Sequence, residues 1–211
     1  KYREKYAQGV ILRDHTLQLY NTFLENLGEN QTLEQIVQRI LMRKQSVRIL
    51  DVGCGNGNAL AALKELFREK IYTLGIDLIP PDHKQNVDEF LEGDVNQVPI
   101  PRECDLILSF RALHEMGNLN KLIPKLAHAL APGGRAYLWI RMRDAGDGNP
   151  VFVGEMNEGE EKALHSLATK QEIHGSMMLL QPVEIPIPVT TEKQPRHSTI
   201  GGYVVLLHRS L

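Results

Sequence analysis

Cysteine is scarce in this 211-residue chain, which contains only Cys54 and Cys104. Two cysteines cannot build the framework of bridges that stabilises small secreted domains, so we expect two free thiols beside predicted strand ends. Neither sign of charge is in excess, because 24 lysines and arginines are balanced by 26 aspartates and glutamates, a formal net charge of −2. No overall basic field attracts nucleic acid, and we expect no nucleic-acid partner.

Long hydrophobic runs are also missing. No apolar segment approaches the roughly 18 residues of a membrane span, so we expect no membrane partner and a cytoplasmic protein. The pair His114-Glu115 has Asn118 where the zinc-binding His-Glu-x-x-His pattern needs a second histidine, and we expect no metal site. A composition of 42% hydrophobic and 24% charged residues is typical of a globular chain with one sizeable core.

The most informative stretch is Asp51-Val52-Gly53-Cys54-Gly55-Asn56-Gly57. The short apolar segment 47–50 precedes it, and strong helix formers with apolar residues at helical spacing follow over 58–67. Strand, glycine turn and helix in this order are typical of the first βα unit of an open α/β sheet, which binds ligands at the carboxyl ends of its strands. The glycines let the backbone turn sharply and approach a ligand closely.

The spacing of these glycines narrows the choice of ligand. The dinucleotide pattern Gly-x-Gly-x-x-Gly would need glycine at position 58 or 60, where Asn58 and Leu60 stand, and no Gly-Lys-Ser/Thr is present. An acidic residue followed by Gly-x-Gly-x-Gly resembles instead the first motif of the class I S-adenosylmethionine-dependent methyltransferases. A glycine turn that only packs the helix on the strand remains the alternative at this point.

The second predicted strand, 71–77, ends in Asp77, which lies 20 residues after Gly57. An acidic residue at this point of an α/β fold holds a ribose, because its oxygens accept hydrogen bonds from the hydroxyls. We therefore expect Asp77 to hold the ribose and the following Leu78 to flank the adenine ring. This second agreement favours a ligand-binding role for the glycine loop.

The third predicted strand, 90–95, ends in Asp94 and Val95. The resemblance implies that Asp94 takes the adenine amino group and that the next backbone N–H reaches a ring nitrogen. An Asx turn is the alternative for Asp94. The connection 80–86 begins with two prolines and is short, so we expect no more than a turn where the family usually has a helix.

The remaining chain follows the same fold. The apolar run 104–110 predicts a central strand, and the apolar stripe over 119–130 predicts a helix. Leu130-Ala131-Pro132-Gly133-Gly134 matches another family signature, which turns the chain into a fifth strand over 136–140. We then expect a loop over 141–154 and a helix from about 158 to about 173. Two strands follow, over 177–190 and 202–208, and the prolines of the first restrict it to a sheet edge.

The resemblance implies the fold class α/β, a Rossmann-like class I methyltransferase sandwich. Its seven-stranded, mostly parallel sheet has the order 3-2-1-4-5-7-6 and an antiparallel last strand. Residues 1–45 are expected to form an N-terminal helical cap, with helices over 14–27 and from a Thr32 cap to Leu41. Residues 46–211 are expected to bind S-adenosylmethionine, and both parts to form one structural domain. The chain starts without methionine, which is consistent with part of a larger polypeptide.

The resemblance implies S-adenosylmethionine as cofactor and S-adenosylhomocysteine (SAH) as product. The expected cofactor contacts are Asp51, Gly53, Cys54, Gly55, Gly57, Asp77, Leu78, Asp94, Val95 and Ser109. The sulfonium already activates the methyl group, so the main task of the protein is to orient the nucleophile, and no universal catalytic residue is required.

A nucleophile that carries a proton would need a base after the fourth strand. His114 is the first candidate and Glu115 the second, with helix capping or packing as the alternative for His114. Arg111, Arg141 and Arg143 are candidate substrate-binding residues for an anionic acceptor, and exposed loop positions are their alternative.

We expect methyl transfer by in-line displacement to an oxygen or nitrogen of a small molecule. Leu113-His114 resembles a pair found in small-molecule methyltransferases. The segment from Asp77 to Asp94 resembles the RNA ribose 2′-O-methyltransferases, but Ser109 stands where their catalytic aspartate would be. An RNA or protein methyltransferase, and a non-catalytic S-adenosylmethionine-binding module of a larger protein, stay open as alternatives.

Overall fold

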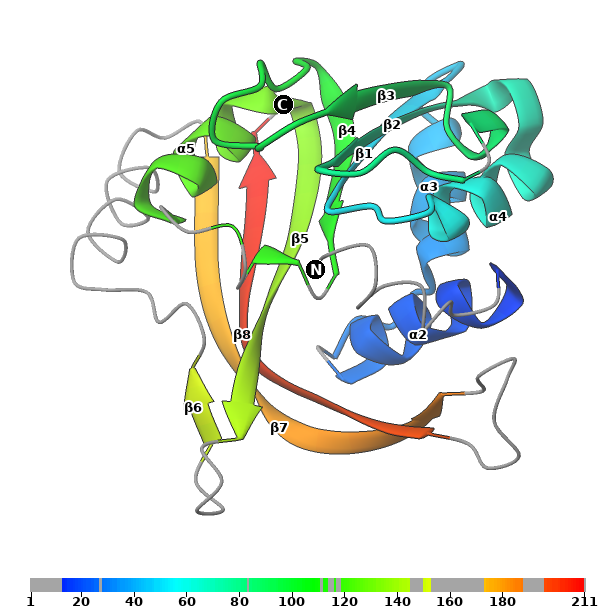
Figure 1. The fold of residues 1–211 in the computed structure, drawn as a ribbon. Coiled ribbons are helices and arrows are strands. Elements are labelled where there is room, and N and C mark those ends of the chain that lie inside the picture. The colour runs from blue at the N-terminus through cyan, green and yellow to red at the C-terminus, as the bar shows by residue number, and fades with distance from the viewer. Residues whose placement is uncertain are drawn as a thin grey trace.

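The computed structural model describes residues 13–26, 28–82, 84–110, 112–113, 116, 119–144, 150–152, 173–187 and 196–210. One sheet lies between two layers of helices, with α2, α3 and α4 on one face and α5 on the other (Figure 1). The helices are α2 (Arg13–Asn26), α3 (Leu33–Leu41), α4 (Asn58–Phe67) and α5 (Leu119–Ala129), with short 3₁₀ turns η1 (Arg68–Lys70) and η2 (Lys84–Asn86).

The described strands are β1 (Val47–Val52), β2 (Ile71–Asp77), β3 (Glu89–Glu92), β4 (Cys104–Ser109), β5 (Leu130–Asp144), β6 (Pro150–Phe152), β7 (Ile173–Ile187) and β8 (Arg196–Arg209). Their order is β3-β2-β1-β4-β5-β8-β7, and β6 pairs with β5 off this path. The first five strands pair in parallel, and β8 is antiparallel to β5 and β7. The expected order with an antiparallel last strand is confirmed.

The core divides along the two faces of the sheet. In β1, Leu50 and Val52 pack with α5, and Val47 and Ile49 pack with α2, α3 and α4. All six residues of β4 are buried, as a central parallel strand covered on both faces requires. The apolar stripe predicted to form a helix is α5, and the Thr32 cap of α3 is present as a capping box with Gln35.

The segment 130–134, predicted to be a turn before a fifth strand over 136–140, is instead the start of β5 at Leu130. Pairing of β4 with β5 jumps from Cys104 opposite Leu130 to Leu106 opposite Arg135, so the intervening residues bulge out of register. Gly133 has φ +76°, and a Cβ on Gly134 would lie 2.8 Å from the carbonyl oxygens of Ala131 and Cys104. The two glycines therefore permit this irregular start of the strand, which other residues would obstruct.

The C-terminal third differs from expectation. The predicted loop over 141–154 is wrong in part, because β5 continues to Asp144 and 150–152 form β6. β7 starts before Met177 and β8 before Gly202, because the two strands pair as one antiparallel ribbon from Ile173–Arg209 to Ile187–Arg196. This ribbon extends past the rest of the sheet and curves (Figure 1). Cross-strand pairing thus starts both strands earlier than their local patterns indicate.

The proline-rich strand does lie at an edge. β7 is the outermost strand, and its pairing with β8 breaks register between Leu180 and Val183, next to Pro182. The helix predicted from about 158 lies outside the described residues, except for Ile173, which begins β7 instead.

Candidate cofactor site

The glycine loop follows β1 at the carboxyl end of the parallel strands. Gly53, Gly55 and Gly57 have φ values of +76°, +53° and +68°, a region that other residues rarely adopt. A Cβ on Gly53 would lie 2.2 Å from the Cβ of Ala112, in the segment after β4. The loop therefore packs so closely against that segment that position 53 admits no side chain.

Asp77 joins the end of β2 to the glycine loop. Its Oδ2 accepts a hydrogen bond from the Gly55 N–H at 2.8 Å, and its Oδ1 accepts one from the Leu78 N–H at 2.7 Å. Oδ1 also accepts the Ile79 N–H at 3.4 Å. The second lone pair of Oδ2 therefore remains to accept a hydrogen bond from a ligand hydroxyl. Asp77, the residue that we expect to hold the ribose, is thus hydrogen-bonded to the glycine loop.

The connection between β2 and β3 is fastened to the same loop. Asn56 and Asp82 bond reciprocally, from Asn56 Nδ2 to Asp82 Oδ2 at 3.3 Å and from the Asp82 N–H to Asn56 Oδ1 at 3.2 Å. The buried Asn86 donates its Nδ2 to the Asn56 carbonyl at 2.7 Å. The short connection, with η2 as its turn, is therefore held against the glycine loop by Asn56, a contact that the sequence did not predict.

Asp51 lies buried at the end of β1. The hydroxyl of Tyr20, which α2 supplies, lies 3.3 Å from each carboxylate oxygen and donates to them. Burial raises the pKa of Asp51 to about 7, the Tyr20 hydrogen bond opposes this rise, and the charge of Asp77 adds to it. Burial, followed by the charges of Asp51 and Asp77, raises the pKa of Cys54 well above its ordinary value, so this thiol stays protonated.

Aromatic rings anchor α2 beside this carboxylate. The ring centroid of Phe110, the residue after β4, lies 4.7 Å from those of Tyr20 and Trp139 and 5.4 Å from that of Phe23. Such contacts stabilise beyond the apolar area that they bury. Tyr20 and Phe23 fit the apolar stripe of the predicted helix, but nothing in the spacing revealed that the Tyr20 hydroxyl would meet Asp51.

Asp94 forms the Asx turn that was its alternative role. Its Oδ1 accepts the Asn96 N–H at 2.9 Å and Asn96 Nδ2 at 3.0 Å, and Asn96 Nδ2 also donates to the Met116 carbonyl at 2.7 Å. Within the described part of the chain, Oδ2 receives no hydrogen bond, so the adenine contact stays a prediction. The neighbouring Val95 is buried and Leu78 is exposed.

Ser109 is buried at the end of β4 and donates its hydroxyl to the Val52 carbonyl at 2.8 Å. This bond ties β4 to β1 beneath the glycine loop and uses the only proton of the side chain, so a cofactor contact could use its lone pairs alone. His114, Glu115 and Arg111 lie outside the described residues. Arg141 and Arg143 belong to β5, where only their backbone is described.

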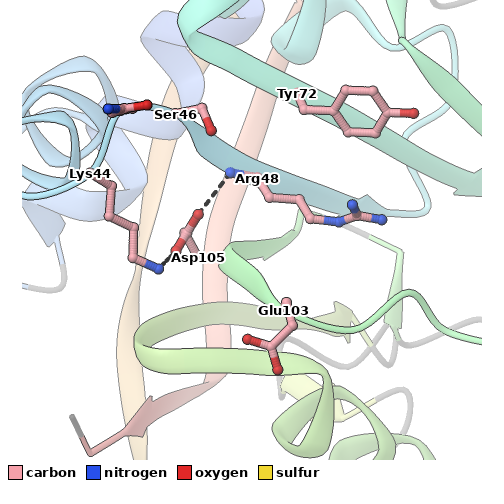
Figure 2. Close-up of a pocket in the computed structure, with 7 residues that line it drawn as sticks. Lys44, Ser46, Arg48, Tyr72, Glu103 and Asp105 are labelled. Atoms are coloured by element: carbon pink, nitrogen blue, oxygen red, sulfur yellow. Dashed lines mark hydrogen bonds and ion pairs between the residues drawn. The ribbon is translucent and has the colours of Figure 1, made fainter.

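A cavity of about 420 Å³ opens at the other end of the sheet, where β1, β2 and β4 begin. In Figure 2, Lys44 reaches Asp105 and the Arg48 side chain runs beneath Tyr72, with its guanidinium carbon 5.3 Å from the ring centroid. Asp105 also accepts the Arg48 N–H at 2.8 Å. None of the predicted site residues lines this cavity.

The comparisons with known proteins agree with this geometry. A family model described as a methyltransferase domain matches residues 23–171. The chain belongs to this family. It is a class I, S-adenosylmethionine-dependent methyltransferase domain, and S-adenosylmethionine is its cofactor.

Two curated relatives illustrate the similarity. The fatty-acid O-methyltransferase of Mycolicibacterium smegmatis is 32% identical over 95 residues, which are 41% of this chain and 34% of that protein. The malonyl-[acyl-carrier protein] O-methyltransferase of Chlorobium luteolum is 32% identical over 98 residues, 41% of this chain and 37% of that protein. The matched segments of the chain therefore span about a third of the length of each relative.

A solved structure shows the same fold. The plantazolicin methyltransferase BpumL, in complex with SAH, superposes with a TM-score of 0.55 at 13% identity, over 94% of this chain and 88% of that one. Within the ranges described above, no helix of the methyltransferase domain is long and apolar enough to cross a membrane. The same ranges contain no group of three or more His, Cys, Asp or Glu that could hold a metal ion.

Proposed function

We propose that the chain catalyses methyl transfer from S-adenosylmethionine to an oxygen of a small carboxylic acid. The observation that carries the proposal is the bridge from Asp77 to Gly55, which places a carboxylate beside a loop whose three glycines all have positive φ. The names of both curated relatives support the acceptor class, because one names a fatty acid, the other a malonyl group, and both are O-methyltransferases.

The donor groups around the loop fit the cofactor. Asp77 offers acceptors for ribose hydroxyls, and Asp94 and Val95 are proposed for the adenine ring. The N-terminus of α4 has no side-chain cap at Gly57 and no acidic residue in its first turn, so its peptide N–H groups can receive the carboxylate of an amino acid. Asp51 is proposed to face the ammonium group.

When bound, S-adenosylmethionine supplies a methyl group that its sulfonium already activates. The chain's own residues then have to orient the acceptor oxygen and exclude water, which contributes several kcal/mol or more. The aromatic contacts of Phe110 hold α2 over the end of β4 and so contribute to closing this side of the site. Arg111, Arg141 and Arg143 are proposed to hold the anionic acceptor.

A base is required only for some acceptors. A carboxylate is already ionised near neutral pH, whereas a hydroxyl or an ammonium keeps a proton that must leave before transfer. His114 is proposed as the base for such protonated acceptors and Glu115 as the second candidate.

The test measures SAH formation with a panel of small carboxylic acids, small alcohols and amines, and unmodified transfer RNA. We expect acceptor-dependent SAH formation with at least one carboxylic acid, and its loss in Asp77→Ala. Turnover only with RNA, at low salt, would replace the proposal with the RNA alternative. SAH binding in calorimetry without turnover on any acceptor would favour the non-catalytic module.

A further inference from the structure

The contact between Tyr20 and Asp51 brings together two segments with different roles. Asp51 ends the strand that carries the glycine loop, and Tyr20 belongs to α2, before the first residue that the family model matches. Both side chains are buried, with 5% and 3% of their surface exposed. The hydrogen bond therefore joins a residue just outside the matched range to the end of β1 inside it.

No cation accompanies this buried carboxylate in the described part of the chain. The groups that act on Asp51 are the Tyr20 hydroxyl from α2, the Cys54 thiol from the glycine loop and the Asp77 carboxylate from β2, none of which is positive. The described ion pairs are Lys44–Asp105 and Lys64–Asp88. Burying a carboxylate without a positive partner is costly, so the site favours a ligand that brings a cation.

We propose that Tyr20 is a positioning residue for the cofactor: its hydroxyl holds Asp51 ready for the cofactor's ammonium group and links cofactor uptake to the release of a proton. This inference rests on the proposed function, because the ammonium belongs to S-adenosylmethionine and to its product SAH. Tyr20 acts through Asp51, and the aromatic contact with Phe110 keeps its ring in place.

The proton balance follows from the state of Asp51. With a pKa of about 7, the free site holds a protonated carboxyl about nine times in ten at pH 6 and about one time in four at pH 7.5. An ammonium beside the carboxyl favours the ionised form, so the carboxyl proton leaves to the solvent as the ammonium–carboxylate pair forms. SAH should therefore bind about tenfold more weakly at pH 6 than on the plateau above about pH 8.

Loss of the Tyr20 hydroxyl shifts this balance in a defined direction. The hydrogen bond from Tyr20 lowers the pKa of Asp51, so Tyr20→Phe raises that pKa and moves the pH dependence of binding upward. Tyr137→Phe is the matched control, because Tyr137 is also buried and donates its hydroxyl at 3.1 Å to Glu29, away from Asp51. Both variants remove one hydroxyl and keep the ring.

Isothermal titration calorimetry with SAH, in two buffers of different ionisation enthalpy at pH 6 and pH 7.5, counts the released protons. We expect release of about 0.9 proton at pH 6 and about 0.25 at pH 7.5 in the parent. Tyr20→Phe should release more at pH 7.5 and bind SAH three- to tenfold more weakly there, whereas Tyr137→Phe should match the parent. Asp51→Asn should release none. 5′-Methylthioadenosine, which lacks the ammonium, should bind without proton release.

The possible negative results distinguish the proposed function from the inference about Tyr20. A parent that binds no SAH overturns the proposed function and this inference with it. A parent that binds SAH without proton release, or a Tyr20→Phe variant that matches the parent, overturns the inference and leaves the proposed function standing. Circular dichroism checks the fold of each variant, and Tyr20→Met, which also lacks the hydroxyl but can repack, replaces Tyr20→Phe if that variant is unfolded.

Discussion

Gly55 donates its backbone N–H to Oδ2 of Asp77 at 2.8 Å, which joins the glycine loop to the end of β2 through one carboxylate. The two residues are 22 positions apart in the chain, and the parallel register of β1 and β2 brings them together. The carboxylate therefore orders the loop and remains able to accept further hydrogen bonds from a ligand.

Asp77→Ala should weaken SAH binding by about 1–3 kcal/mol, because it removes a charge-assisted acceptor of ribose hydroxyls. Asp77→Asn is the informative companion. Its amide oxygen can still accept the Gly55 N–H, so it separates the order of the loop from the charge at the ribose. Calorimetry with SAH gives both affinities. An Asp77→Ala variant with the affinity of the parent would show that the ribose is held elsewhere.

Gly53→Ala should destabilise the fold by about 2–4 kcal/mol and abolish SAH binding. The new Cβ would lie 2.2 Å from the Cβ of Ala112, and φ of +76° adds strain. Gly28→Ala is the matched control, because Gly28 has nearly the same φ, +77°, with nothing within 4 Å of a Cβ.

The control should lose only about 1 kcal/mol, the cost of the backbone conformation alone. Urea unfolding of both variants measures the difference. If the two glycine variants lose the same free energy of unfolding, the contact between the glycine loop and the segment after β4 is not tight in solution.

Short sequence patterns predicted the two parts of the candidate site that depend on the ends of single strands, the glycine loop and Asp77. The glycine spacing placed the loop, and the position of Asp77 at the end of a strand placed its carboxylate, because a parallel sheet brings strand ends to one edge. The Asn56–Asp82 pair and the Tyr20–Asp51 pair could not be found in this way. Their members are 26 and 31 residues apart, and only the packing of whole elements brings them together.

The starts of β7 and β8 escaped prediction for a related reason. The strands were predicted to begin at 177 and 202, but β7 begins at Ile173 and β8 at Arg196, where the partner strand supplies hydrogen bonds. The edge position of β7, in contrast, followed from its prolines alone, because a proline has no N–H to donate and fits where that side of the strand has no partner.

His114→Ala should lower kcat with a hydroxyl acceptor at least tenfold and leave the affinity for SAH within twofold, because a general base acts on the acceptor and not on the cofactor. With a carboxylic acid acceptor the same variant should keep its kcat, since that oxygen carries no proton near neutral pH. Steady-state rates with one acceptor of each kind separate the two cases. An unchanged rate with the hydroxyl acceptor would remove His114 from the proposed mechanism and turn attention to Glu115.

The free energy of unfolding should depend on pH because of Asp51, even without cofactor. Burial raises the pKa of this carboxyl from 3.8 to about 7, so the folded chain favours its protonated form. Its contribution to stability is therefore complete below about pH 4 and is lost by about 1.4 kcal/mol per pH unit up to about pH 7. Asp51→Asn, which cannot titrate, should gain about 2–4 kcal/mol relative to the parent between pH 4.5 and pH 7.5.

Asp88 provides the control, because its pKa is shifted in the opposite direction from that of Asp51. Burial alone would raise its pKa, but hydrogen bonds from Lys64 and Thr73 outweigh burial and lower it, so its contribution is present above the unfolded pKa of about 4 and lost only in stronger acid. Asp88→Asn should therefore lose stability by a nearly constant amount from pH 4.5 to pH 7.5. Urea unfolding across that range tests both variants. If the curves of Asp51→Asn and the parent run parallel, Asp51 is ionised in the folded chain throughout, and its carboxylate has a positive partner in solution.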